Sequence, residues 1–266
     1  MVTTTSHTSA AGMLDLTGRV ALITGSSRGI GRACAVRLAE AGADVVVNYV
    51  TSRTAAQEVA EEVQQLGRRA VVVKADVSEQ EDVQAMADFI KETFGALDIV
   101  VSNAASGGFR QLVDANARHF EATMNTNVRA LLWLVQATLP LLARTQGRSK
   151  VIALSSQGSH RAQPLYGLVG ASKAALASMV RHFALEIGGR GVNLNIVEAG
   201  LVQTDSFRLM PHGSLLAERV RERSMVGGQL VTERDVADAV LFLASPLSDM
   251  VQGHTLVVDG GCSMLG

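Results

Sequence analysis

Short apolar runs rich in β-branched residues alternate with amphipathic helical patterns along the chain, and this alternation constrains the fold more than any other feature. We predict strands at 19–24, 44–48, 70–75, 98–102, 150–154, 192–197 and 254–258. The segments between them predict helices at 29–42, 52–67, 79–95, 116–145, 172–188 and 232–244. Such alternation is typical of βαβ units joined by right-handed crossovers. We therefore expect an α/β fold with a doubly wound, seven-stranded parallel sheet and helices on both faces.

Composition excludes several classes of protein. The net charge is −1 and 47% of the residues are apolar, so a large core is expected and a general affinity for nucleic acid or anionic membranes is not. No run of eighteen apolar residues predicts a membrane span, and no histidine or cysteine spacing indicates a metal site. Cys34 and Cys262 are expected to be reduced, packed thiols of a cytoplasmic protein. Residues 1–12 are expected to form a flexible tail and 13–266 a single domain.

A glycine-rich segment follows the first predicted strand and reads TGSSRGIG at 24–31. Glycines let a backbone approach a pyrophosphate, and the N-terminus of the next helix offers free N–H groups and the positive end of its dipole. The spacing GxxxGxG differs from the common GxGxxG, but its strand–loop–helix context predicts a Rossmann fold that binds a dinucleotide. The candidate contacts are Gly25, Ser27, Arg28, Gly29, Ile30 and Gly31.

The end of the second strand indicates which dinucleotide binds. NAD enzymes carry an acidic residue there for the ribose 2′-hydroxyl, whereas this chain reads NYVTSR from Asn48 to Arg53. Arg28 and Arg53 without a nearby carboxylate suit a 2′-phosphate, so NADPH is the predicted cofactor. Alternatively, both arginines are solvated surface residues. Asp76 and Val77, after the third strand, are candidates for contacting the adenine.

Further motifs make the chain similar to the short-chain dehydrogenase/reductase family over nearly its whole length. Besides the glycine loop, they are the pair Asp76-Val77, SNAA at 102–105, Asn127, the pair Ser155-Ser156, SKAAL at 172–176 and VDGG at 258–261. The resemblance implies that Asn103 and Ala104 lie beside the cofactor and that Val202 and Thr204 lie near its carboxamide. Ala199-Gly200 replaces the family's usual Pro-Gly, which affects the expected shape of that loop.

The position of the tyrosine departs from the usual family pattern. The common Tyr-x-x-x-Lys motif would place a tyrosine at residue 169, but Val169 stands there and the nearest tyrosine is Tyr166, seven residues before Lys173. This Tyr-x6-Lys spacing resembles the NADPH-dependent type III enoyl-acyl carrier protein reductases. In a helix, both positions would share a face with Lys173, with Tyr166 about 5 Å further along.

The longer spacing is consistent with reduction of a conjugated double bond. When hydride adds to the β carbon of an enoyl thioester, negative charge appears on an oxygen two carbons away, so a more distant donor suits it. Tyr166 would stabilise that oxygen, and the resemblance implies that Lys173 holds the nicotinamide ribose. Ser156 is a candidate substrate contact or a turn cap. Asn127 is a candidate for bending the long helix and relaying protons, or a structural asparagine.

The predicted function is therefore NADPH-dependent reduction of a 2-enoyl thioester carried by acyl carrier protein or coenzyme A, in fatty acid or polyketide biosynthesis. Two alternatives stay open: reduction of a 3-oxoacyl or other carbonyl, and a non-catalytic NADP-binding sensor or assembly protein. The resemblance also implies a homodimer or homotetramer. Residues 200–228 lack a clear period and are expected to form a substrate flap, in which Met210, Leu215, Leu216 and Met225 could line an acyl channel. His160 is a further candidate for a substrate contact.

Overall fold

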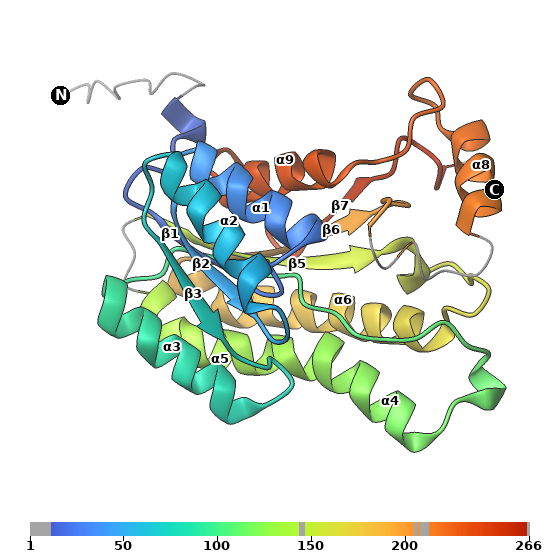
Figure 1. Cartoon of the computed structure of the whole chain (residues 1–266), viewed down its shortest axis with the longest axis horizontal. Coiled ribbons are helices and arrows are strands. Elements are labelled where there is room, and N and C mark those ends of the chain that lie inside the picture. The colour runs from blue at the N-terminus through green and yellow to red at the C-terminus, as the bar shows by residue number, and fades with distance from the viewer. Residues whose placement is uncertain (1–11, 144–146, 205–206, 208–212, 265–266) are drawn as a thin grey trace.

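The computed structural model describes residues 12–143, 147–204, 207 and 213–264. Its described strands form one parallel sheet in the order β3-β2-β1-β4-β5-β6-β7 (Figure 1). The strands are β1 (Val20–Ile23), β2 (Asp44–Tyr49), β3 (Ala70–Lys74), β4 (Ile99–Ser102), β5 (Ser149–Ser156), β6 (Val192–Ala199) and β7 (Thr255–Val258). The predicted seven-stranded, doubly wound Rossmann fold is confirmed. The strands that follow β1 are added on one side of it up to β3, and those from β4 onward are added on its other side. In sheets of this kind, ligands bind at the carboxyl ends of the strands where the order reverses, here between β1 and β4.

Helices cover both faces of the sheet (Figure 1). One face carries α1 (Gly29–Glu40), α2 (Arg53–Gln65) and α9 (Glu233–Ala244), and the other carries α3 (Gln80–Phe94), α5 (Ala130–Leu142) and α6 (Gly167–Ile187). Successive residues of a strand point to opposite faces. Ala21 and Ile23 therefore join the core under α1, while Val20 and Leu22 join the core on the opposite side. This double burial explains why the strands are apolar throughout.

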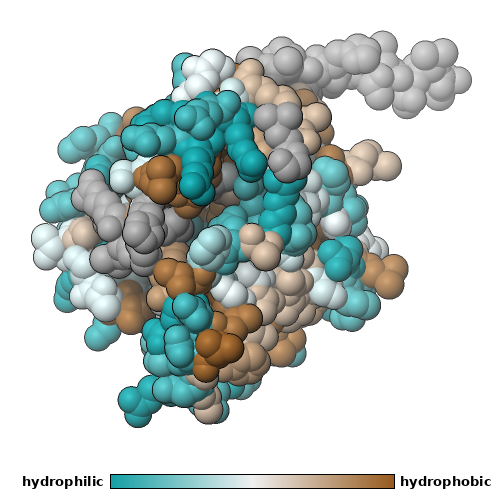
Figure 2. Space-filling view, turned by 90° about the vertical axis from the view of Figure 1, so that its right-hand side faces the viewer, coloured by the Kyte–Doolittle hydropathy of each residue, from teal (hydrophilic) through white to brown (hydrophobic). Residues whose placement is uncertain are grey.

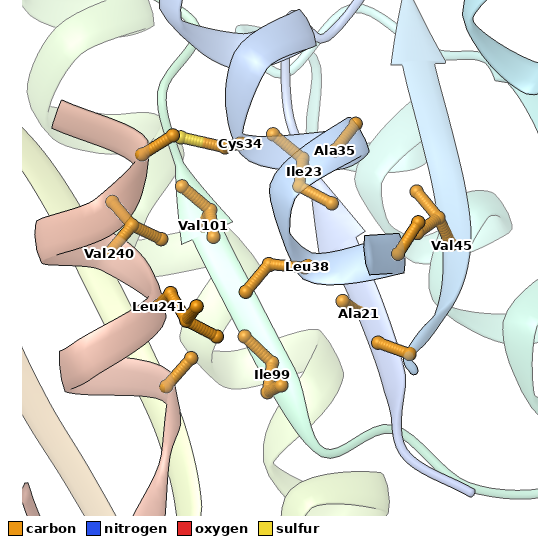
Figure 3. Packing of buried hydrophobic residues seen from close by; sticks show 14 of the residues in the cluster. Ala21, Ile23, Cys34, Ala35, Leu38, Val45, Ile99, Val101, Val240 and Leu241 are labelled. Atoms are coloured by element: carbon orange, nitrogen blue, oxygen red, sulfur yellow. The ribbon is translucent and has the colours of Figure 1, made fainter. Parts of the chain in front are cut away.

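The core under α1 shows how the strand–helix units pack (Figure 3). Leu38 of α1 and Val240 of α9 lie over Ile99 and Val101 of β4, and all four side chains are buried. Cys34 lies in the same core, where burial raises the pKa of its thiol to about 12. A thiol in such surroundings stays protonated and packs as a small apolar side chain.

Local signals explain where several helices begin and end. Thr232 caps α9 by accepting from the Asp235 backbone N–H, and the Asp235 side chain accepts in return from the Thr232 backbone N–H. This reciprocal pair is a capping box, and it confirms Thr232 as the predicted cap. Gly95 ends α3 in the left-handed conformation, with φ of 75°, a conformation that glycine adopts without steric cost.

The structure differs from the predicted elements in three places. The helix expected over 116–145 consists of α4 (Ala117–Met124), a π-helical turn (Asn125–Arg129) and α5. The helix expected from residue 172 begins five residues earlier, at Gly167. The segment expected to be irregular contains α8 (Gly213–Arg223), in which only Gly213 and Ala217 are buried. A helix with so narrow a buried face carries little hydrophobic periodicity.

None of the helices in the described ranges is long and apolar enough to cross a membrane.

Candidate active site

A large cleft opens at the carboxyl ends of the strands and has a volume of about 1030 Å³. The glycine loop, the ends of β2 to β5 and helix α8 contribute residues to its walls. Figure 2 faces this end of the molecule, where apolar and hydrophilic side chains lie side by side at the surface. The cleft contains most of the predicted site residues: Gly25, Ser27, Arg28, Gly29, Ile30, Gly31, Asp76, Val77, Asn103, Ala104, Ser156, Tyr166, Lys173, Val202 and Thr204.

The glycine loop has a shape that only glycines allow. Gly25 and Gly29 have φ angles of 62° and 56°, in the left-handed region. A Cβ atom on Gly31 would lie 2.5 Å from both the Gly25 carbonyl oxygen and the Asn103 side-chain nitrogen. Asn103 Nδ2 donates to the carbonyl oxygens of Thr24 and Gly25 at 2.9 and 3.1 Å. The asparagine of the SNAA motif thus holds the loop in place.

Helix α1 begins in this loop with no side-chain cap, because Arg28 at its N-cap position makes no capping hydrogen bond. The first N–H groups of a helix need partners, and an anion can provide them. Gly29, Ile30 and Gly31 form this first turn and line the cleft. The chain therefore presents a pyrophosphate-sized backbone cradle at the positive end of a helix dipole, and these residues fit a dinucleotide.

Asn48 and Arg53 do not line the cleft, although both are predicted cofactor contacts. Asn48 is fully buried, its Oδ1 accepts from the Gly25 backbone N–H at 3.0 Å, and its Nδ2 donates to the Ala75 carbonyl at 3.0 Å. It therefore braces the glycine loop from behind.

Arg53 is exposed at the start of α2. Tyr49, Val50 and Thr51 line the cleft at the end of β2 instead, and none of them carries a carboxylate.

Tyr166 lies at the N-cap position of α6, so the helix begins one residue after it. Tyr166, Lys173 and Ser156 all line the cleft. Val169, at the position where the usual motif has its tyrosine, is 9% exposed and does not line the cleft. A Cβ atom on Gly107 would lie 2.4 Å from Val169 Cγ2, so these two residues pack tightly against one another. Tyr166 is thus the tyrosine that α6 presents to the cleft.

Burial shifts the ionisation of both Tyr166 and Lys173. Burial raises the pKa of the Tyr166 phenol, and a hydrogen bond with Ser156 partly opposes the shift. Burial also lowers the pKa of Lys173 to about 8, because the charged form loses hydration. Lys173 Nζ donates to the Leu154 carbonyl oxygen at 2.7 Å. The site therefore holds a neutral phenol that can donate a hydrogen bond, beside an ammonium group that titrates near physiological pH.

The turn before α6 positions the tyrosine. Leu165 has φ of 63°, and it is the one non-glycine residue with positive φ among those described. Its carbonyl accepts from the Arg110 backbone N–H at 2.8 Å. A Cβ atom on Gly158 would lie 2.4 Å from the Tyr166 ring, and the centroids of the Phe109 and Tyr166 rings are 6.2 Å apart. Sequence reasoning missed Phe109, which lines the cleft with no motif to mark it.

Asn127 lies in the π-helical turn between α4 and α5 and is buried. Its Oδ1 accepts from the Ser106 backbone N–H at 2.8 Å, and its Nδ2 donates to Ser106 O and Ser172 Oγ, both at 2.9 Å. Asn127 does not line the cleft. Its amide ties the segment after β4 to α6, and π-helical turns are frequent at functional sites. The π-helical turn thus interrupts the long helix at Asn127, which is a candidate for bending that helix.

The flap contributes only part of the predicted acyl channel. Leu215 and Leu216 of α8 line the cleft. Met225 instead packs against the C-terminal segment, where a Cβ atom on Gly261 would lie 2.8 Å from its sulfur. Met210 lies outside the described residues. His160 does not line the cleft either, although Arg161, which follows it, does.

The last motif, VDGG, joins the C-terminal segment to the site. Asp259 accepts from Gln157 Nε2 at 2.7 Å and from the backbone N–H groups of Gly261 and Ser263 at 2.8 and 2.7 Å. Gln157 follows Ser156, so this contact anchors the end of β5. Among the described residues, no group of three or more histidine, cysteine or acidic side chains could hold a metal ion.

Comparison with known proteins agrees with this geometry. Residues 25–263 match the family described as Enoyl-(Acyl carrier protein) reductase. The chain is 37% identical to a 1-cyclohexenylcarbonyl-CoA reductase of Streptomyces collinus, over 93% of this chain and 88% of the relative. It is 34% identical to a hydroxynaphthalene reductase-like protein of Metarhizium majus, over 93% and 96%. A short-chain dehydrogenase of Burkholderia cenocepacia, solved in complex with NADP, superposes with a TM-score of 0.84 at 37% identity, over 93% of this chain and 99% of that one. The chain is an oxidoreductase of the short-chain dehydrogenase/reductase family.

Proposed function

We propose that the protein reduces the carbon–carbon double bond of a 2-enoyl thioester with NADPH. The observation that carries the proposal lies at the start of α6. Tyr166 lines the cleft, whereas Val169, at the usual tyrosine position, packs against Gly107. The donor is therefore three residues further from Lys173 along the chain than in the usual motif, a spacing that corresponds to about one helical turn. That displacement suits a substrate whose developing negative charge lies two carbons from the carbon that receives hydride.

The cofactor assignment rests on the cradle and on charge. The uncapped first turn of α1 suits the pyrophosphate. Arg28 lines the cleft near the end of β2, where Tyr49, Val50 and Thr51 carry no acid to repel a 2′-phosphate. A solved relative that contains NADP supports this choice. Asp76 and Val77 are proposed to contact the adenine, and Val202 and Thr204 the carboxamide.

The bound nicotinamide would supply the hydride, which adds to the β carbon of the substrate. The Tyr166 hydroxyl then donates to the thioester oxygen as that oxygen gains negative charge. Lys173 holds the ribose hydroxyls, and its positive charge lowers the energy of the same oxyanion. Ser156, which is hydrogen-bonded to Tyr166, orients the phenol. Protonation at the α carbon completes the reaction.

A coenzyme A thioester is the favoured form of the substrate, because a relative named for such a substrate is 37% identical. Phe109, Leu215 and Leu216 give the cleft apolar walls that suit an acyl group. Leu112, Val113, Phe120 and Leu185 are exposed on α4, α6 and the segment before α4, which supports homo-oligomers formed through these helices. Buried, unpaired Cys34 and Cys262 support a cytoplasmic location.

Reduction of a carbonyl is the second candidate. It is favoured by the hydroxynaphthalene reductase-like relative and by the 30% identity, with a TM-score of 0.90, to a gluconate 5-dehydrogenase of Burkholderia cenocepacia. In this reading Tyr166 donates directly to the carbonyl oxygen. A non-catalytic NADP-binding protein would need neither Tyr166 nor Lys173 in the cleft, and their presence argues against it.

The deciding experiment follows NADPH consumption with a 2-enoyl-CoA and a 3-oxoacyl-CoA offered in parallel. We expect turnover on the enoyl substrate, at least tenfold faster than on the oxo substrate. Turnover on the oxo substrate alone would contradict the proposal and show that the protein is a carbonyl reductase. NADPH binding without turnover on either substrate would favour the non-catalytic alternative.

A further inference from the structure

Two buried polar atoms beside the active site have no hydrogen-bond partner in the described structure. They are Ser155 Oγ on β5 and Glu198 Oε1 on β6. The two residues are register neighbours on adjacent parallel strands, so their side chains project from the same face of the sheet. Buried polar atoms are nearly always paired. Two such atoms on neighbouring residues mark a place for a bridging water.

The other carboxyl oxygen of Glu198 contacts residues near the protein surface. Glu198 Oε2 accepts from Ser159 Oγ at 3.0 Å and lies 3.4 Å from His160 Nδ1. The Glu198 side chain is 3% exposed, whereas the His160 side chain is 52% exposed. Ser159 Oγ is also 3.2 Å from His160 Nδ1. The buried carboxyl group of Glu198 thus connects a solvent-accessible imidazole with the interior.

Ser155 stands at the inner end of this path. It lines the cleft, and it lies between Ser156, which bonds Tyr166, and Leu154, whose carbonyl accepts from Lys173 Nζ at 2.7 Å. Reduction by hydride consumes one proton per turnover, whichever unsaturated bond receives the hydride. A bound cofactor and substrate would fill the mouth of the cleft, so a separate route along the ends of β5 and β6 would supply that proton.

We propose that His160, Glu198 and Ser155 form a proton path from solvent to the active site. In each turnover one hydride and one proton add across the substrate's double bond. The Ser155 hydroxyl gives its proton to the reduced substrate and regains one from the Glu198 carboxyl group through a bridging water, because Ser155 Oγ and Glu198 Oε1 are not hydrogen-bonded to each other. The resulting carboxylate regains a proton from the His160 imidazolium, which recovers one from solvent. Glu198 acts through Ser155 and does not touch the substrate. The inference rests on the proposed reduction but not on the choice between enoyl and oxo substrates.

Glu198→Gln in the full-length chain tests the path, because glutamine keeps the size and the acceptor for Ser159 but cannot transfer a proton. We expect kcat to fall about tenfold to a hundredfold. KM for the acyl thioester and Kd for NADPH should stay unchanged, and the solvent deuterium isotope effect on kcat should increase. His160→Ala should lower kcat similarly, and millimolar imidazole in the buffer should restore it. His182→Ala, which removes an exposed imidazole of α6, is the matched control and should leave kcat unchanged.

Each outcome decides between the hypotheses. A Glu198→Gln variant with the wild-type kcat and isotope effect would overturn the path while leaving the proposed function intact. If that variant does not fold, the His160→Ala variant carries the test, and loss of activity that imidazole fails to restore would overturn the path. Wild-type protein that turns over neither substrate would overturn the proposed function and the path together.

Discussion

Two buried lysines lie near opposite ends of strand β5, Lys150 in the strand itself and Lys173 in helix α6, and they have different surroundings. At the start of the strand, Lys150 is 2% exposed, and its Nζ donates to Asp249, Ser248 and Asn193 at 2.7, 3.1 and 3.2 Å. At the other end, Lys173 is 7% exposed and, within the described part of the chain, has one hydrogen bond, to a backbone carbonyl. Burial lowers the pKa of both, and Asp249 opposes the shift only at Lys150.

This difference separates a structural from a functional use of the same side chain. An ammonium group has three donors, and Lys150 uses them on a counter-ion and two polar side chains within the protein. Lys173 has donor capacity left over in a cleft that fits a dinucleotide. A buried charge without a counter-ion costs stability, and proteins tolerate such a cost mainly at sites where the charge acts on a ligand.

The largest effect is expected on activity from Lys173→Met. Removing the ammonium group should lower turnover about a thousandfold or more, because both the contact to the ribose and the charge that stabilises the oxyanion are lost, and should weaken NADPH binding. Steady-state kinetics and a fluorescence titration with NADPH measure the two effects. Lys150→Met is the matched control, since it removes an equally buried ammonium group outside the cleft. Equal activity loss in both variants would show that the comparison is wrong.

Tyr166→Phe is expected to lower turnover about a hundredfold to a thousandfold, because one preorganised donor to an oxyanion is lost. The phenyl ring still fills the space beside Gly158 and Phe109, so the melting temperature and Kd for NADPH should stay near those of the wild type. Turnover on a 2-enoyl thioester is the measurement. If activity is retained, Tyr166 is not the donor in this cleft.

Gly31→Ala should weaken NADPH binding about tenfold to a hundredfold. The added Cβ would lie 2.5 Å from Gly25 O and Asn103 Nδ2, and overpacking of this kind typically costs about 1–3 kcal/mol. Gly189→Ala is the control, since a Cβ there meets nothing within 4 Å. Equal affinities of the two variants for NADPH would contradict the assignment of the glycine loop.

The two substitutions should also change the free energy of unfolding of the protein in opposite directions. Lys150→Met leaves the partly exposed Asp249 without its partner and should lower the free energy of unfolding by about 1–3 kcal/mol. Lys173→Met should raise it at pH 7 by up to about 3 kcal/mol, because a folded-state pKa of about 8 lies below the unfolded value near 10.4. Urea unfolding at pH 7 gives both values.

The smallest expected effect is the change with pH in the stability difference between Lys173→Met and the wild type, and it tests the lowered pKa of Lys173 directly. Between about pH 8 and 10.4 the unfolded chain binds more protons at Lys173 than the folded chain, so this residue makes wild-type stability rise with pH in that window. The advantage of Lys173→Met over the wild type should therefore shrink from pH 7 to pH 10. A constant difference would mean that the folded-state pKa is not lowered.

Much of the fold was predictable because its signals are local. Continuous apolar strands, glycine after the first of them and the cap at Thr232 act within a few residues, and each correctly predicted its element. Helix α8 escaped prediction because it buries so little surface. The start of α6 was misplaced because Gly167 and Gly170 lower helix propensity, while packing of Leu112 on Gly167 and of Gly158 on Gly170 holds that turn.

The amino-acid sequence by itself determined the α/β fold, the glycine cradle and the spacing of Tyr166 from Lys173, because periodicity, backbone freedom and helical pitch follow from neighbouring residues. Only the tertiary structure decided that Asn48 braces the loop from behind, that Arg53 does not line the cleft and that Val169 is packed while Tyr166 lines the cleft. It alone also placed Glu198 beside Ser155 and His160. The reason is physical: which side chain reaches a cleft depends on contacts between segments far apart in the chain, and no local pattern encodes them.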